Sequence, residues 1–460
     1  MTSIILLAGF GIINLFVGFL KSNRILLPLA LLFLAVVFGV NMLSWNDTQS
    51  YFNNMLTIDN YAVAFTGIMV LSTLLILPFS QRYVEANDQN LAEYYAMLLF
   101  SLVGAVMMVS FENVIMLFVG IEILSISMYV LAGSDKKSIR SNEAALKYFL
   151  MGSFFTGILL FGIVLVYGAT GTFNISEISA AQTDADGLQN TMFTMGLLIM
   201  IIGISFKISA APFHFWTPDV YEGTPTLFTS FMSTVVKIAG VAAFYKLMVA
   251  GFAASYAVWF PTLIAITVLT LVVGNIGAVV QHNVKRMLAY SSISHAGYLL
   301  MSLIAFNERS DASIFFYSLA YATATIAAFG VLQLVTVQRG EESFQGFNGL
   351  GKTNPLLAFA MTISMLSLAG IPLTAGFFAK FFVFASILEN ADLMWLVVLA
   401  VILASVGIYY YFKVVIAMYL QPAGDYGRVK VTGFVSFVLI FITVLTILFG
   451  IAPALMSDIL

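Results

Sequence analysis

Long runs of apolar residues, separated by short polar connectors, make up almost the whole chain. A helix of about 20 apolar residues crosses the roughly 30 Å of hydrocarbon in a bilayer, and continuous rather than alternating apolar runs favour helices over a β-barrel. We therefore expect an all-α polytopic membrane protein. The pattern predicts fourteen transmembrane helices, near residues 3–20, 25–43, 62–80, 94–111, 113–132, 144–167, 191–211, 226–249, 257–280, 287–306, 312–337, 356–388, 393–419 and 431–455.

The composition agrees with this class and excludes several functions. Of the 460 residues, 61% are hydrophobic and 9% are charged, whereas about 25% of a soluble domain is charged. The net charge of −3 provides no basic surface for nucleic acid. The chain has no cysteine, which excludes disulfides and cysteine-ligated zinc or iron–sulfur sites. Because the connectors are also too short for a nucleotide- or flavin-binding domain, we expect no cofactor and no metal in this chain.

The basic residues in the connectors predict the orientation of the chain. Twelve of them fall on one side of the membrane, whereas only Lys246 and Arg309 fall on the other. Since Lys and Arg accumulate in cytoplasmic loops, we expect both termini on the periplasmic side of the inner membrane. The twelve residues are Lys21, Arg24, Arg82, Lys136, Lys137, Arg140, Lys285, Arg286, Arg339, Lys352, Arg428 and Lys430.

One connector contains a misleading motif. The segment Gly346–Thr353 matches the phosphate-binding pattern G-x-x-x-x-G-K-[ST]. That pattern holds phosphate only between a strand and a helix of an α/β sheet, and here it joins two predicted membrane spans. We therefore interpret Lys352 as a basic connector residue and reject a nucleotide site.

Two charged residues lie at the middle of predicted spans. Glu122 occupies the centre of 113–132, and Lys237 occupies the centre of 226–249. A charge at this depth costs about 2.5–3.5 kcal/mol on insertion scales, and such residues often mark an ion path. A structural Glu–Lys pair that fastens two helices is the alternative, but cheaper polar groups would serve that purpose.

Two further spans contain features that interrupt a helix. Pro212 follows Lys207 within Gly203–His214, which indicates a break in the seventh span. The twelfth span, 356–388, would be about 50 Å long as one helix, so we expect it to break between Gly370 and Gly376, ahead of Lys380. Broken helices of opposite direction are typical of inverted repeats with an ion site at the breaks. Two unrelated proline kinks are the alternative.

This arrangement predicts two inverted five-helix repeats, formed by helices 4–8 and helices 9–13. The eighth and thirteenth helices then correspond, and they carry Lys237 and Lys413. The predicted divisions are an N-terminal three-helix segment at 1–93, a first proton half-channel at 94–250, a second half-channel at 251–420, and a C-terminal helix at 421–460.

The chemistry that buried lysines permit is proton transfer. Burial disfavours the ammonium form and a neighbouring carboxylate favours it, so a balanced lysine can load and release a proton while Glu122 acts as a switch. For four other residues, the sequence does not decide between a role in proton transfer and a structural role. Lys147 and Lys413 fit either a relay or a side chain that reaches the inner surface, whereas His214 and His295 fit either a proton path or a hydrogen-bonded core.

Three segments resemble the antiporter-like membrane-arm subunits of respiratory complex I, the proton-translocating NADH:quinone oxidoreductase. They are Phe206–Thr226, Asn283–Tyr298 and Ser367–Lys380, and with the fourteen spans the resemblance covers the whole chain. The sequence of Asp219–Gly223 resembles one subunit of this group more than the others. The resemblance implies that Glu122, Lys207, Lys237 and Lys380 match the family's charged residues on helices 5, 7, 8 and 12, and that Lys147 and His295 match residues of helices 6 and 10.

The resemblance also implies a function and partners. The chain would carry no redox cofactor, and FMN, iron–sulfur clusters and quinone would be held by partner subunits. It would move protons when quinone reduction elsewhere in the complex shifts charge along a polar axis at mid-membrane, and it would contact other membrane-arm subunits and lipid. Two alternatives are a subunit of a multi-subunit cation/proton antiporter and a non-conducting scaffold of the membrane arm.

Overall fold

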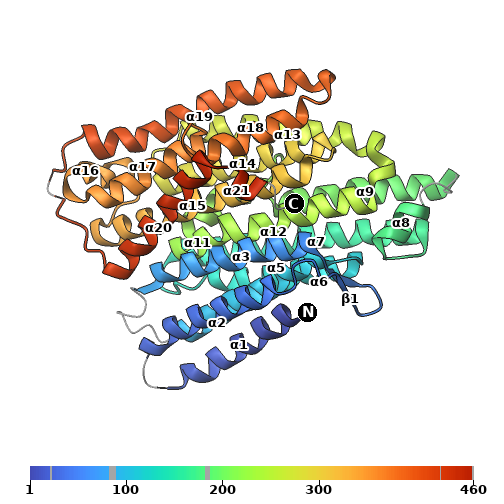
Figure 1. Ribbon diagram of the computed structural model, residues 1–460, viewed down its shortest axis with the longest axis horizontal. Coiled ribbons are helices and arrows are strands. Elements are labelled where there is room, and N and C mark those ends of the chain that lie inside the picture. The colour runs from blue at the N-terminus through green and yellow to red at the C-terminus, as the bar shows by residue number, and fades with distance from the viewer. Residues whose placement is uncertain (21–22, 82–89, 182–186, 425, 458–460) are drawn as a thin grey trace. The chain divides into compact units, whose positions relative to one another are not determined.

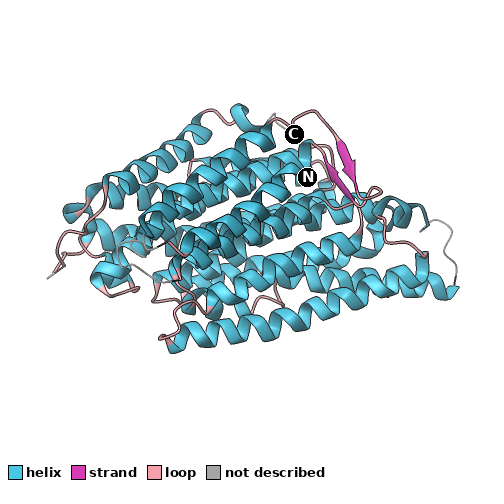
Figure 2. Cartoon of the chain, turned by 90° about the horizontal axis from the view of Figure 1, so that it is seen from below, coloured by secondary structure: helices cyan, strands magenta, loops and turns pink. Residues whose placement is uncertain are grey.

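The computed structural model consists almost entirely of helices in the residues that it describes (Figures 1 and 2). The only strands among them form one short antiparallel hairpin, β1 (Gln49–Tyr51) with β2 (Leu56–Ile58), in which Ser50 pairs with Thr57. Lys21 and Arg82, which entered the orientation argument, lie outside the described residues. These residues are 1–20, 23–81, 90–181, 187–424 and 426–457.

Within the described ranges, twelve helices are long and apolar enough to cross a membrane, and three shorter apolar helices accompany them. The prediction of a polytopic helical membrane protein is therefore confirmed. The count of fourteen spans and the layout of the two repeats stay predictions.

The chain divides into two compact units. Unit 1 comprises Met1–Leu71, Tyr83–Trp216 and Val235–Thr267. Its helix pair α1 and α2 runs side by side (Figure 1). The elements of this unit are α1 (Thr2–Gly18), η1 (Asn23–Ile25), α2 (Leu26–Met42), the hairpin, most of α3 (Asn60–Ile76), α5 (Leu91–Ser110), α6 (Val114–Ala132), α7 (Ile139–Thr170), α8 (Ile175–Ala181), α9 (Gly187–Lys207), α12 (Lys237–Lys246), η5 (Leu247–Gly251), η6 (Ala253–Ser255) and the first half of α13 (Tyr256–Val279).

Unit 2 comprises Ser72–Arg82, Thr217–Thr234 and Val268–Leu460. Its central helix α15 is buried along its length by the helices around it. The elements are η2 (Leu77–Ser80), α10 (Trp216–Gly223), α11 (Thr226–Phe231), the end of α13, α14 (Val284–Ala305), α15 (Ser310–Arg339), η7 (Phe344–Phe347), α16 (Leu350–Thr353), α17 (Pro355–Ala369), α18 (Ala375–Ile387), η8 (Ala391–Leu393), α19 (Met394–Leu420), α20 (Gly433–Ile451) and α21 (Ala454–Ser457).

Small residues let the helices of unit 1 approach closely. A Cβ atom on Gly104 of α5 would lie 2.5 Å from the carbonyl oxygen of Gly120 on α6, which only glycine tolerates. Without a hydrophobic force between helices in lipid, such close contact of backbones supplies the packing energy. This contact fixes α6, and therefore Glu122, against α5.

Both predicted helix breaks are present. Helix α9 ends at Lys207, and the next helix begins only at Trp216. Helix α17 ends at Ala369, Gly370 takes a left-handed conformation with φ of +85°, and α18 begins at Ala375. A glycine in this conformation is a common helix C-terminus, because it lacks the Cβ that would clash. The sequence prediction of a break between Gly370 and Gly376 is confirmed.

Candidate functional site

Lys207 occupies a buried position at the end of the broken helix α9. Its side chain is only 7% exposed, and its Nζ donates a hydrogen bond of 2.7 Å to the Oγ of Ser125 on α6. The hydroxyls of Ser205 and Ser209, on either side of Lys207, are buried and have no hydrogen-bond partner within the described residues. Buried polar groups of this kind are usually satisfied by water, so the surroundings of Lys207 suit a hydrated proton site.

One face of α6 presents three polar groups to this site. Glu122, Ser125 and Tyr129 follow one another at helical spacing. Glu122 is only partly buried, but its charge acts on both Lys207 and Tyr129. The structure thus brings the charge of Glu122 to bear on Lys207 and adds a serine on the same helix, Ser125, that accepts a hydrogen bond from Lys207.

Aromatic rings close the break after Lys207. The indole Nε1 of Trp216 donates to the carbonyl oxygen of Phe206 at 3.1 Å, an oxygen that also accepts from the backbone N–H of Ser209 at 3.0 Å. The ring of Trp216 stacks on Tyr148 with centroids 4.7 Å apart, and Phe206 stacks on Phe155 at 4.2 Å. These contacts hold the end of α9, and with it Lys207, in one position.

Lys237 is the most deeply buried of the predicted lysines, at 2% exposure. It is the first residue of α12 and follows η4 (Met232–Val236), a π-helical segment that the sequence did not predict. One turn further, a Cβ on Gly240 would lie 3.7 Å from the Cγ of Lys207, so α12 packs directly on the end of α9. Lys207 and Lys237 therefore lie on helices in direct contact, and π-helical turns frequently mark functional sites.

Lys147 lies apart from this group. It is on α7, its side chain is 38% exposed, and it forms a 2.7 Å ion pair with Glu143 one turn earlier. In this chain, therefore, the structure does not place Lys147 among the buried lysines.

Lys380 of unit 2 is buried at the second helix break, at 8% exposure. Although it belongs to α18, its Nζ donates to the carbonyl oxygens of Leu368 (3.1 Å) and Ala369 (2.8 Å), the last residues of α17. Helix C-termini favour cations, and the ring of Tyr298 adds a cation–π contact at 4.8 Å. The break itself therefore supplies the groups that hold the charge of Lys380.

His295 lies at the centre of a buried tyrosine cluster in unit 2. Its Nδ1 is 2.7 Å from the hydroxyl of Tyr317, and its Nε2 is 3.2 Å from that of Tyr411. The ring of Tyr298, which contacts Lys380, lies 6.1 Å from the imidazole ring. The cluster connects His295 to the neighbourhood of Lys380, and the sequence analysis missed its tyrosines. The spacing of Tyr317 and Tyr321 by one helical turn was the available signal.

The remaining two candidates differ in their surroundings. Lys413 donates to the carbonyl oxygen of Val279 at 2.7 Å and lies over the rings of Phe344 and Tyr409. His214 is half-buried in the segment between α9 and α10, and its Nδ1 is buried with no hydrogen-bond partner within the described residues. These surroundings assign neither residue a chemical role.

Several residues assigned to connectors are parts of helices. Lys246 was expected in an outer connector, but it is the last residue of α12 and forms a 2.8 Å ion pair with Glu112. Lys285 lies in the first turn of α14, is 3% exposed, and donates to the carbonyl oxygen of Thr224 at 2.7 Å. Those two connector assignments are wrong, because apolar periodicity does not define helix ends. At Lys285, the cap residue Asn283 determines where α14 begins.

The described residues offer few ligands for a metal ion or cofactor. The chain has no cysteine, and the described residues contain no group of three His, Asp or Glu side chains that could hold a metal ion. The rejected motif Gly346–Thr353 forms η7 and the short helix α16 rather than a strand and a helix, and the Thr353 hydroxyl accepts from Arg339 at 3.1 Å.

Fold and site together define a multi-pass helical membrane protein with buried cations at two broken helices, which is an antiporter-like architecture. A family model described as "NADH:quinone oxidoreductase/Mrp antiporter, TM" matches residues 112–407. Subunit N of NADH-quinone oxidoreductase from Cytophaga hutchinsonii is 41% identical over 460 residues, covering 100% of this chain and 99% of that protein. The chain therefore belongs to the NADH:quinone oxidoreductase/Mrp antiporter family of membrane subunits, as its sequence segments indicated.

Solved structures agree with this assignment. A chain of respiratory complex I from Thermus thermophilus with bound aureothin is similar at a TM-score of 0.85 and 30% identity, covering 99% of this chain and 98% of that one. A chain of the Mrp complex from Dietzia sp. DQ12-45-1b shares the fold at a TM-score of 0.87 and 19% identity, covering 100% and 96%.

Proposed function

We propose that this chain is the N subunit of a proton-translocating NADH:quinone oxidoreductase and that its buried lysines relay the protons. The carrying observation is the 2.7 Å bond from the buried Lys207 to Ser125, beside the charge of Glu122. Packing alone does not explain a cation in this position, because burying a charge in the membrane costs free energy. The full-length similarity to subunit N supports the same function.

In unit 1 the proposed switch is Glu122. Its negative charge favours the ammonium form of Lys207. Withdrawing that charge would favour the neutral amine. Lys207 would then release its proton toward Lys237, on the adjacent helix.

In unit 2 the proposed path runs through the tyrosine cluster to Lys380. Hydroxyls and an imidazole within hydrogen-bond distance can pass a proton by exchanging donor and acceptor roles, and His295 has such a partner on each ring nitrogen. We assign Lys147 a supporting role at the surface, where another subunit of the complex would cover it.

The wider assignment follows from this role. Other membrane-arm subunits and lipid would surround the chain, and FMN, iron–sulfur clusters and quinone would reside in partner subunits. Both termini would lie on the periplasmic side of the inner membrane, because the connector cations accumulate on the opposite side. Helices 4–8 and 9–13 would form the two inverted repeats.

A second candidate function is a subunit of a cation/proton antiporter. The family model covers Mrp antiporters, and the Dietzia chain has the same fold. Copurification distinguishes the two: flavin- and iron–sulfur-containing partners support the oxidoreductase, whereas their absence from an intact complex favours the antiporter.

The decisive experiment measures proton pumping by the assembled complex in vesicles. We expect Lys207→Met and Lys237→Ala to reduce pumping strongly in complexes that still assemble. A non-conducting scaffold predicts unchanged pumping in both variants. Lys136→Gln, a connector lysine that is exposed, provides the control and should pump normally.

A further inference from the structure

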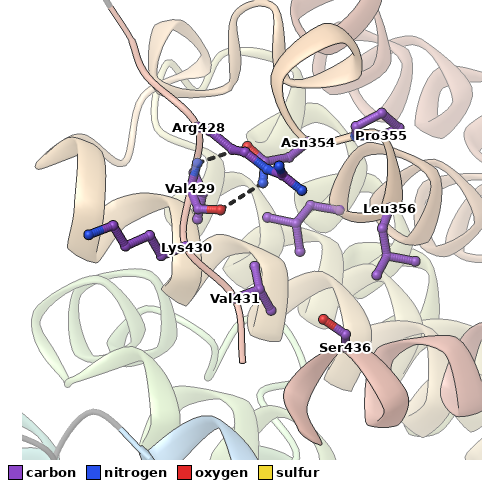
Figure 3. A pocket seen from close by; sticks show the side chains of 9 residues that line it. Asn354, Pro355, Leu356, Arg428, Val429, Lys430, Val431 and Ser436 are labelled. Atoms are coloured by element: carbon purple, nitrogen blue, oxygen red, sulfur yellow. Dashed lines mark hydrogen bonds between the residues drawn. The ribbon is translucent and has the colours of Figure 1, made fainter. Parts of the chain in front are cut away.

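A pocket of about 450 Å³ lies in unit 2 beside the start of α17 (Figure 3). Its lining joins two kinds of side chain. Leu356, Leu357 and Val431 are apolar, whereas Arg428 and Lys430 are basic. The volume falls within the range of small-ligand sites, roughly 300–1,000 Å³. The pocket therefore offers a cationic rim and an apolar wall to one occupant.

The connector that carries the two cations is held firmly in place. The Asn354 side chain makes two hydrogen bonds of 2.8 Å with the backbone of Val429, drawn as dashed lines in Figure 3. The next residue, Lys430, exchanges two backbone bonds with the side-chain amide of Gln338, at 2.6 and 2.7 Å. These four bonds fix the backbone beneath both cations, so the site needs little ordering when a ligand binds.

Within the described residues, the two cations have no counter-charge bonded to them. Arg428 and Lys430 are exposed, and within the described part of the chain neither side chain has a hydrogen bond or ion pair. Arg339 provides a contrast, since its guanidinium donates to the carbonyl oxygens of Gly346 (2.7 Å) and Asn348 (3.1 Å). In the view of Figure 3, the Arg428 side chain extends toward Asn354 and Pro355, and that of Lys430 extends away from them.

We propose that this pocket binds an anionic phospholipid, with the phosphate on Arg428 and Lys430 and the acyl region on Leu356 and Val431. Guanidinium groups bind phosphate strongly because two N–H donors meet two oxygens. Basic pockets between transmembrane helices on the cytoplasmic side bind anionic headgroups, and the connector charges place this segment on that side. None of the residues that line the pocket belongs to the proposed proton path.

The test uses the full-length chain in a neutral detergent, with bound lipid counted by native mass spectrometry. Dioleoyl phosphatidylglycerol, dioleoyl phosphatidylcholine and inorganic phosphate are titrated separately. We expect tight binding of phosphatidylglycerol only. The double variant Arg428→Gln/Lys430→Gln should weaken it about thirtyfold, from about fivefold for each charge removed near the surface.

Two controls separate a built site from diffuse attraction. Lys136→Gln/Lys137→Gln removes the same charge from an exposed connector far along the sequence and should change binding less than twofold. Ser436→Phe fills the pocket, keeps both cations, and should also abolish binding, with thermal melting confirming that each variant folds.

Several results would overturn the proposal. They are equal weakening in both double variants, equal binding of phosphatidylcholine, and no loss on replacing Arg428 and Lys430. Displacement of the lipid by equimolar inorganic phosphate would instead indicate a free-phosphate site. An intact complex that retains no lipid there, because a partner subunit seals the pocket, would equally contradict it.

Discussion

The hydrogen bond between Lys207 and Ser125 allows the most direct test of the proposed relay. Ser125→Ala removes the oxygen that accepts from Nζ at 2.7 Å and changes the helix surface little. A hydrogen bond to a charged group contributes about 1.5–3 kcal/mol, and one between neutral groups about 1 kcal/mol. The ammonium form therefore loses about 1.4 kcal/mol relative to the neutral amine, and the ratio of ammonium to neutral amine falls about tenfold.

The measurement is proton uptake per NADH oxidised, with the assembled complex in sealed vesicles and a pH-sensitive dye. We expect Ser125→Ala to lower this ratio several-fold and Ser125→Thr, which keeps the hydroxyl, to restore it. Ser127→Ala is the matched control, because Ser127 is buried on the same helix and, among the residues that the structure describes, its hydroxyl bonds only to the Ile123 carbonyl oxygen. Equal pumping by Ser125→Ala and Ser127→Ala would show that the Ser125 hydroxyl does not hold the proton on Lys207.

Two further predictions concern stability. Glu112→Gln leaves the buried Lys246 without its carboxylate and should lower the free energy of unfolding by about 2 kcal/mol. Glu143→Gln breaks an exposed ion pair and should lower it by about 0.5 kcal/mol at most. Similar melting temperatures of the two variants would contradict this prediction. Gly370→Ala and Gly171→Ala both strain a positive φ, but only at Gly370 would the new Cβ meet another side chain, at 2.8 Å. We therefore expect melting and pumping to suffer more in Gly370→Ala, and equal effects would show that crowding is unimportant.

Hydropathy, together with the proline and glycine residues that interrupt helices, predicted the secondary-structure elements well. Each predicted span overlaps a helix, because the bilayer requires long apolar runs whatever the tertiary contacts are. The breaks at Lys207 and Gly370 were also predictable. Pro212 prevents a continuous helix at the first break, and residues 356–388 are too many for one membrane-spanning helix at the second. These features depend on local chain geometry alone.

The partners of the buried lysines were not predictable from the sequence. Ser125 is 82 residues from Lys207, and hydropathy gives no indication of which face of α6 turns toward α9. The tyrosine cluster has the same origin: α15 is buried on every side, so its apolar pattern has no polar face from which an orientation could be derived. The π-helical turn before Lys237 follows from packing and has no motif of its own.

The two broken helices hold their lysines by different means, and this difference has a consequence for proton release. Lys207 bonds to a hydroxyl and lies in the field of a carboxylate whose charge can change, so its ammonium form responds to Glu122. Lys380 bonds to two backbone carbonyls at the end of α17 and to an aromatic face, and such dipoles keep their charge distribution. In the proposed relay, release of a proton from Lys380 would therefore require α17 and α18 to shift relative to each other or Tyr298 to move, whereas release from Lys207 would require only a change in the charge of Glu122.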